Sequence, residues 1–210
     1  MTSRLQNDAI RRFLAHARIE TPVICGPMYP CSNPELVAAV SAAGGLGVVQ
    51  PISLTYVHGH DFREGLRLIF KLSGGKPIGL NALIEASSET YKRRMEQWVD
   101  IALEEGVRFF VTSLGNPRWI VERAHAAGAV VYHDATEKRF AEKAMDANVD
   151  GLIAVNRHAG GHLGGLAKTD AAGNLPSTLA GHEYQVKTIV DYFQAVFDGN
   201  TSHSGLLERL

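Results

Sequence analysis

Six short apolar runs recur along the chain at a nearly regular interval. They begin at positions 23, 45, 77, 107, 129 and 151, which are 22, 32, 30, 22 and 22 residues apart. Each run is rich in apolar residues and bounded by Gly, Pro or Asp, as expected of a strand that is buried on both faces. The predicted strands are Val23–Gly26, Gly45–Val49, Pro77–Leu80, Val107–Val111, Ala129–Tyr132 and Gly151–Val155.

Helical patterns separate these runs. One begins at Asn33, a favourable N-cap, with Pro34 at the first helical position. Others cover Ser88–Glu105, Pro117–Ala127 and Thr136–Ala147. Strands that alternate with helices in this way predict βαβ units and a parallel sheet, either doubly wound or part of a (β/α)₈ barrel.

The regular alternation ends after Val155. Two further βα units need about 60 residues at the usual size of such a barrel, and 55 remain from Asn156 onward. We therefore expect an α/β fold with TIM-barrel-type parallel strands, incomplete, with about six βα units in residues 1–166. Residues 167–210 are expected to form an atypical polar segment with a tail helix over about Glu183–Phe197. An open barrel exposes strand edges, so we expect the tail to cover them, or the chain to form homo-oligomers or aggregate.

The balance of charges excludes several classes of partner. Lys and Arg number 21 against 22 Asp and Glu, so there is no general basic field for nucleic acid. No apolar stretch approaches the roughly 18 residues of a membrane span. Two cysteines, Cys25 and Cys31, make no disulfide framework, so we expect a cytoplasmic protein without a nucleic-acid or membrane partner.

Two stretches near predicted strand ends are candidates for ligand binding. Gly26, Pro27 and Met28 close the first strand, and residues 43–47 read Ala-Gly-Gly-Leu-Gly. Glycine there allows the backbone to approach a flat or anionic ligand, although tight turns and helix ends are the favoured explanation of these glycines taken alone. Asn81 is expected at the end of the third strand, where its amide could bind the edge of a heterocycle or simply form a turn.

A third candidate is the glycine-rich stretch 156–165, which follows the sixth predicted strand. His162 stands among four glycines, which argue against a packed interior. Histidine has an ordinary pKa near 6.5, which suits proton abstraction at neutral pH. His58, His60 and Asp61 are metal-ligand types, but they lack further ligands at metal-site spacing, and we expect no metal.

The order of these motifs resembles the nitronate monooxygenase (2-nitropropane dioxygenase) family over about residues 20–166. The motifs are Gly-Pro-Met at 26–28, Ala-Gly-Gly-Leu-Gly at 43–47, Gly-Leu-Asn at 79–81 and Ala-Gly-Gly-His-Leu-Gly at 159–164. Members are FMN-dependent TIM-barrel oxidoreductases, and flavin-dependent enoyl-acyl-carrier-protein reductases are close relatives.

The resemblance implies a small-molecule substrate, O₂ and bound FMN. His162 would be the catalytic base that removes the α-proton of a nitroalkane, and the nitronate would then be oxidised. The residues implied to lie against the flavin are Pro27, Met28, Asn81, Gly160 and Gly161.

The sequence departs from the family pattern at three places. His158 stands where the family commonly has Glu before Ala-Gly-Gly-His, and Asp134 stands where some members carry Lys. Nothing after about Leu166 matches the glycine-rich turns that hold the FMN phosphate. Three functions therefore stay open. They are a nitronate monooxygenase, an enoyl reductase that uses a nicotinamide donor, and a non-catalytic remnant that cannot hold FMN and serves as a binding or assembly module.

Overall fold

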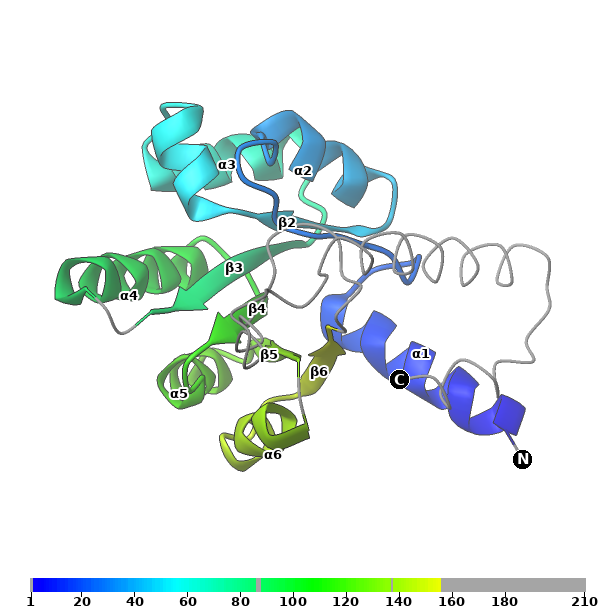
Figure 1. Cartoon of the computed structure of the whole chain (residues 1–210). Helices are drawn as coiled ribbons and strands as arrows, with labels where there is room; N and C mark the ends of the chain where they lie inside the picture. The colour runs from blue at the N-terminus through cyan, green and yellow to red at the C-terminus, as the bar shows by residue number, and fades with distance from the viewer. Residues whose placement is uncertain (1, 86–87, 137, 156–210) are drawn as a thin grey trace, which may run out of the picture.

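A computed structural model describes residues 2–85, 88–136 and 138–155, and within them it shows a curled sheet of six parallel strands (Figure 1). The strand order is β1 to β6, the order of the sequence, so each strand pairs with its successor. A doubly wound sheet reverses direction at a switch point, and this order does not. The prediction of TIM-barrel-type parallel strands is confirmed, and the described residues form six strands of such a barrel. The strands are β1 Ile24–Cys25, β2 Leu46–Val49, β3 Ile78–Ile84, β4 Phe109–Leu114, β5 Val130–Ala135 and β6 Gly151–Ala154.

Helices follow most of the strands. Those expected from sequence are α2 Pro34–Ala42, α4 Glu89–Glu104, α5 Arg118–Ala126 and α6 Lys138–Asp146, and two more, α1 Thr2–Ala17 and α3 Phe62–Leu72, were not expected. A π-helical segment, Ser53–Val57, lies between β2 and α3. None of the helices in the described ranges is long and apolar enough to cross a membrane.

Local capping explains where several helices begin. The Asn33 Oδ1 accepts a hydrogen bond from the Leu36 N–H at 2.8 Å, and Pro34 takes the first helical position of α2. Asp61, from the stretch considered for metal binding, caps α3 by accepting from the Glu64 N–H at 3.1 Å. Each cap satisfies an N–H that a helix leaves without an internal partner.

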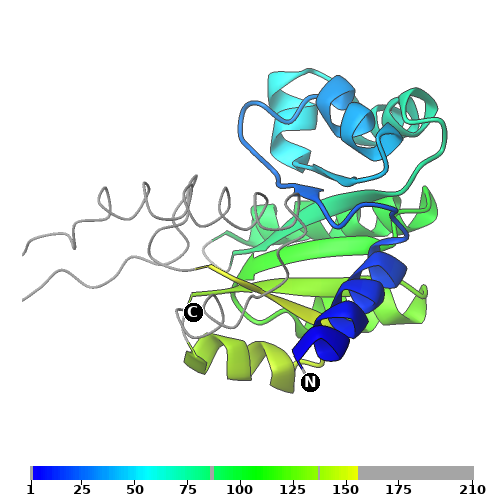
Figure 2. The ribbon, with the colours of Figure 1, turned by 90° about the vertical axis from the view of Figure 1, so that its right-hand side faces the viewer.

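The two faces of the sheet pack against different elements. The outer face carries Leu80, Phe110 and Val131 and packs against helices α2–α5 in the larger hydrophobic core. The inner face carries Leu46, Val48, Phe109 and Val111, and α1 covers part of it, in front of the strands in Figure 2. The inner face of a barrel is the one that leads to the site at the carboxyl ends of the strands.

Candidate active site

The segment after β1 combines a fixed backbone with an exposed side chain. The Met28 N–H donates to the Ser32 Oγ at 2.8 Å, and the Met28 carbonyl accepts from the Ser32 N–H at the same distance. Met28 itself is 47% exposed. A Cβ added at Gly26 would meet no atom within 4 Å. The backbone at this strand end is therefore anchored, with open space beside it.

Asn81 lies in the middle of β3, so the prediction that it stands at the end of this strand is wrong. The apolar run continues through Ile84 because β3 pairs with β4 up to the pair Ile84 and Leu114. Strand residues alternate between faces. A Cβ added at Gly79 would contact Val48 and Leu46 of the inner face, so Asn81, two residues further, also faces inward.

The Asn81 side chain is buried, with 7% of the residue exposed. Within the described residues its carboxamide has no hydrogen-bond partner. Its amide atoms keep some contact with solvent, so a ligand could replace water as their hydrogen-bond partner. Asn81 therefore fits the role of a ligand-binding amide.

Two further polar residues share the inner face with Asn81. Val130 and Tyr132 of β5 belong to the inner cluster, so Asp134 faces inward as well. Thr112 pairs with His133, which places Ser113 beside Asp134 on the neighbouring strand. We call Asn81, Ser113 and Asp134 the inner polar row.

Burial changes the acidity of the Asp134 carboxyl. Loss of solvation raises the pKa of Asp134 to about 6, because the charged form is the one that burial penalises. Sequence analysis identified Asp134 only as a departure from the family pattern. Its inward orientation depends on the pairing of β4, β5 and β6, which no local motif reveals.

His133 adjoins Asp134 but belongs to the opposite face. It is 3% exposed, and its Nδ1 lies 2.8 Å from the Thr112 Oγ1. Burial lowers the pKa of His133, so the neutral ring is favoured. This histidine is part of the packing between sheet and helices and lies apart from the inner polar row.

The glycines of residues 43–47 serve the fold. Gly44 has φ +89°, in the region that favours glycine, at the end of α2. A Cβ added at Gly47 would lie 2.2 Å from the Val37 carbonyl oxygen of α2. The interpretation as turns and close packing therefore holds for this motif, whereas Gly26 keeps open space beside it.

Other predicted site residues lie outside the described residues. These are His162, Gly160 and Gly161, together with the predicted tail helix, and their roles stay predictions. The His58 Nε2 lies 3.1 Å from the Pro30 carbonyl oxygen, and the two cysteines are free. No group of three or more His, Cys, Asp or Glu side chains suited to a metal ion occurs in the described ranges.

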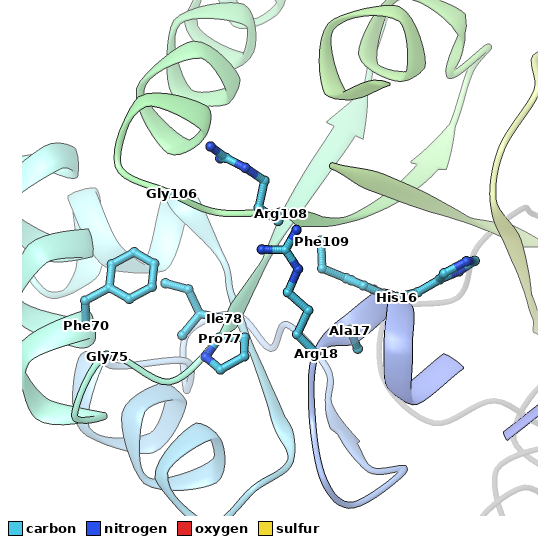
Figure 3. Close-up of a pocket in the computed structure, with 10 residues that line it drawn as sticks. All are labelled: His16, Ala17, Arg18, Phe70, Gly75, Pro77, Ile78, Gly106, Arg108 and Phe109. Carbon is cyan, nitrogen blue, oxygen red and sulfur yellow. The ribbon is translucent and has the colours of Figure 1, made fainter. Parts of the chain in front are cut away.

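A pocket of about 220 Å³ lies at the other end of the sheet (Figure 3). It is formed where α1 ends and where β3 and β4 begin, with Arg18, Pro77 and Arg108 in its wall. The Arg108 guanidinium donates at 2.8 Å to the carbonyl oxygens of Leu103 and Val107. This arginine therefore holds the end of α4, and the pocket is separate from the inner polar row.

Known proteins share both the sequence pattern and the fold. Residues 11–183 match the sequence model of the nitronate monooxygenase family. A Rhodococcus jostii protein named (3aS,4S,5R,7aS)-5-hydroxy-7a-methyl-1-oxo-octahydro-1H-indene-4-carboxyl-CoA dehydrogenase is 29% identical over 161 residues, which are 77% of this chain and 42% of that protein. The nitronate monooxygenase of Pseudomonas aeruginosa is 33% identical over 91 residues, covering 42% of this chain and 24% of that protein.

Solved structures give the same picture. FabK from Thermotoga maritima superimposes with a TM-score of 0.59 and 26% identity, over 76% of this chain and 48% of that chain. A nitroalkane oxidase from Streptomyces ansochromogenes also has a TM-score of 0.59, at 23% identity over 78% of this chain and 55% of that chain, which is a likeness of fold. The chain spans less than half the length of the curated relatives it matches. Since the family model covers most of the chain, this protein belongs to the nitronate monooxygenase family.

Proposed function

We propose that this protein is an FMN-dependent oxidoreductase that oxidises alkyl nitronates with O₂. The observation that carries the proposal is Asn81, a largely buried residue on the inner face of a barrel of this family, whose carboxamide is bonded by no described residue. An amide both donates and accepts hydrogen bonds, as the edge of a flavin ring requires.

The residues present fit a flat heterocycle. Gly26 leaves open space at the end of β1, and the anchored backbone of Pro27 and Met28 offers a wall beside it. Asn81 would hold the edge of the ring, and Met28 would cover its apolar surface. When bound, the flavin supplies the redox chemistry with O₂, while the protein positions the substrate and keeps water away.

His162 is proposed as the base that removes the α-proton from a neutral nitroalkane. This assignment comes from the sequence motif, because the residue lies outside the described ranges. We expect His162→Asn to reduce turnover of nitroethane about 100-fold or more, the usual size of general-base catalysis. Turnover of preformed ethyl nitronate should be largely spared. Equal loss on both substrates would remove His162 from the role of base.

A second candidate is the oxidation or reduction of an acyl thioester. The Rhodococcus jostii relative named as a carboxyl-CoA dehydrogenase matches 77% of this chain, and FabK is similar at 26% identity. An enoyl reductase requires a nicotinamide donor. Bleaching of the flavin by NADH or NADPH, without oxidation of ethyl nitronate, would therefore favour this second function.

The first test is the visible absorbance of the purified protein, before and after addition of FMN and removal of the excess. We expect flavin to be retained, and O₂ consumption to depend on ethyl nitronate. Protein that stays colourless would contradict the proposal and favour the non-catalytic remnant.

A variant tests the flavin contact directly. Asn81→Leu keeps a similar side-chain volume but removes both hydrogen-bonding groups, so we expect it to retain much less FMN. Gln97→Leu is the matched control, since it removes an amide from an exposed position of α4. FMN retention by Asn81→Leu equal to that of the control would contradict the assignment.

A further inference from the structure

The Asp134 carboxyl lies on the inner face near the carboxyl end of β5, where a barrel places its reaction site. It pairs with Ile153 of β6 on one side and adjoins Ser113 of β4 on the other. Neither neighbour carries a charge. Among the described residues, Asp134 has no ion pair and no hydrogen bond from its side chain.

Charged and titratable groups near β5 serve other contacts. The His16 Nδ1 lies 3.1 Å from the Tyr132 hydroxyl on the inner face, toward the amino end of β5. The Asp150 Oδ2 accepts from the Val131 N–H at 2.7 Å and lies 2.9 Å from the His125 Nε2. Lys143 of α6 lowers the pKa of His133, on the outer face. Among the described residues, the groups around β5 that titrate or carry charge thus include Arg12, His16, His125, Tyr132, His133, Lys143 and Asp150.

We propose that Asp134 is a catalytic residue that, as a neutral carboxylic acid, donates a hydrogen bond to the substrate oxygen on which negative charge develops. This inference rests on the proposed function. The oxygen belongs to the nitro group of a nitroalkane or, in the second candidate function, to the carbonyl of an acyl thioester.

The step that Asp134 would assist is the removal of a proton from the substrate. The Cα–H bond of the substrate breaks, its proton goes to the base, and the electron pair moves into the adjacent group as a C=N or C=C bond. The charge then rests on oxygen, where the Asp134 O–H donates without transferring its proton. A donor placed at such a developing charge contributes about 10² to 10³ in rate.

Burial supports the neutral form of this acid. It raises the pKa of Asp134 to about 6, and closure of a substrate over the carboxyl removes more water and favours the neutral form further. An ionised Asp134 would repel the developing anion. Below about pH 6 the free protein thus presents an uncharged donor to a reaction that generates negative charge.

Three variants test the proposal with flavin-loaded protein. Asp134→Leu removes the donor, Asp134→Asn keeps an N–H donor that does not titrate, and Asp146→Asn is a control at an exposed carboxyl of α6. We expect Asp134→Leu to lower kcat/KM for nitroethane about 100-fold, and Asp134→Asn to stay within about 10-fold of wild type. The wild-type decline in kcat/KM as Asp134 ionises should be absent in Asp134→Asn. Retention of kcat/KM within two-fold by Asp134→Leu would overturn the proposal.

A second measurement does not depend on turnover. The infrared carbonyl band of a protonated carboxyl, taken as wild type minus Asp134→Asn, should be present at pH 5 and disappear as the pH rises to 8. A carboxylate signal already at pH 5 would overturn the proposal, because it would reveal a cationic partner. If the wild type oxidises neither nitroethane nor an acyl-CoA, the proposed function fails and the catalytic role with it. The infrared band then reports separately whether Asp134 is a neutral acid.

Discussion

The contact between Gly47 and α2 gives the sharpest test of how the site is built. In Gly47→Ala the new methyl group would lie 2.2 Å from the Val37 carbonyl oxygen and 2.9 Å from the Val37 carbonyl carbon and Cα. These are backbone atoms, so no side chain can rotate away. To reach an ordinary contact, α2 has to move by about 1 Å, and its buried Val37 and Ala38 move with it.

Overpacking of a core costs about 1–3 kcal/mol, and we expect the upper end because a whole helix is displaced. Urea unfolding followed by circular dichroism would measure the free energy of unfolding. Gly26→Ala is the matched control, since its methyl group would meet no atom within 4 Å, and it should stay within about 0.5 kcal/mol of wild type. Gly26→Ala should instead weaken FMN retention by filling the space at the end of β1. Wild-type stability in Gly47→Ala, or an equal loss in both variants, would refute this reasoning.

Two further predictions concern stability. Asp134→Asn should become more stable relative to wild type as the pH rises. The folded wild type has its Asp134 pKa raised from 3.8 to about 6, so its stabilising contribution is complete below 3.8 and lost as the pH passes 6. At 1.36 kcal/mol per pKa unit, the gain in free energy of unfolding of Asp134→Asn over wild type grows to about 3 kcal/mol by pH 7. If urea unfolding gives the same difference between the two proteins at pH 4 and at pH 7, the prediction is contradicted. Asn33→Ala should lower the free energy of unfolding by about 1 kcal/mol, because the cap of α2 is lost. Gln97→Ala, at an exposed position of α4, is the control and should change it by less than about 0.5 kcal/mol; thermal unfolding would show both.

Local signals in the sequence predicted most of the fold. The apolar runs predicted all six strands of the described residues, and Asn33 marked the first turn of α2 because a cap acts within one turn. The helix predicted from Ser88 begins at the residue that caps α4. The start of α3 also had a local signal, since Asp61 is followed by Glu64, but Asp61 was considered as a metal ligand. Helix α1 was not predicted, because polar residues surround Phe13 and Leu14 in the sequence and leave no apolar run. In the structure these two side chains pack against the inner face of the sheet.

The positions of the candidate site residues depend more on how the strands pair than on the local sequence. Asn81 stays a predicted site residue, but its predicted place at the end of the strand was wrong, because pairing with β4 carries β3 to Ile84. Asp134 and Ser113 share a face only through the register of β4 and β5, and register is set by contacts across strands. Likewise, Gly47 and Gly26 can be told apart only in the structure, where the Val37 backbone lies against Gly47 and no atom lies close to Gly26.

The sequential strand order has a consequence for synthesis on the ribosome. Each strand can pair with the one made just before it, so the sheet grows in the direction of translation. Helix α1 is the exception, because Phe13 packs on Phe109 with ring centroids 6.2 Å apart and His16 contacts Tyr132, 116 residues later in the chain. Helix α1 therefore waits for β4 and β5 before it can dock. Its docking closes the longest loop among these contacts and is expected to be a late event in folding.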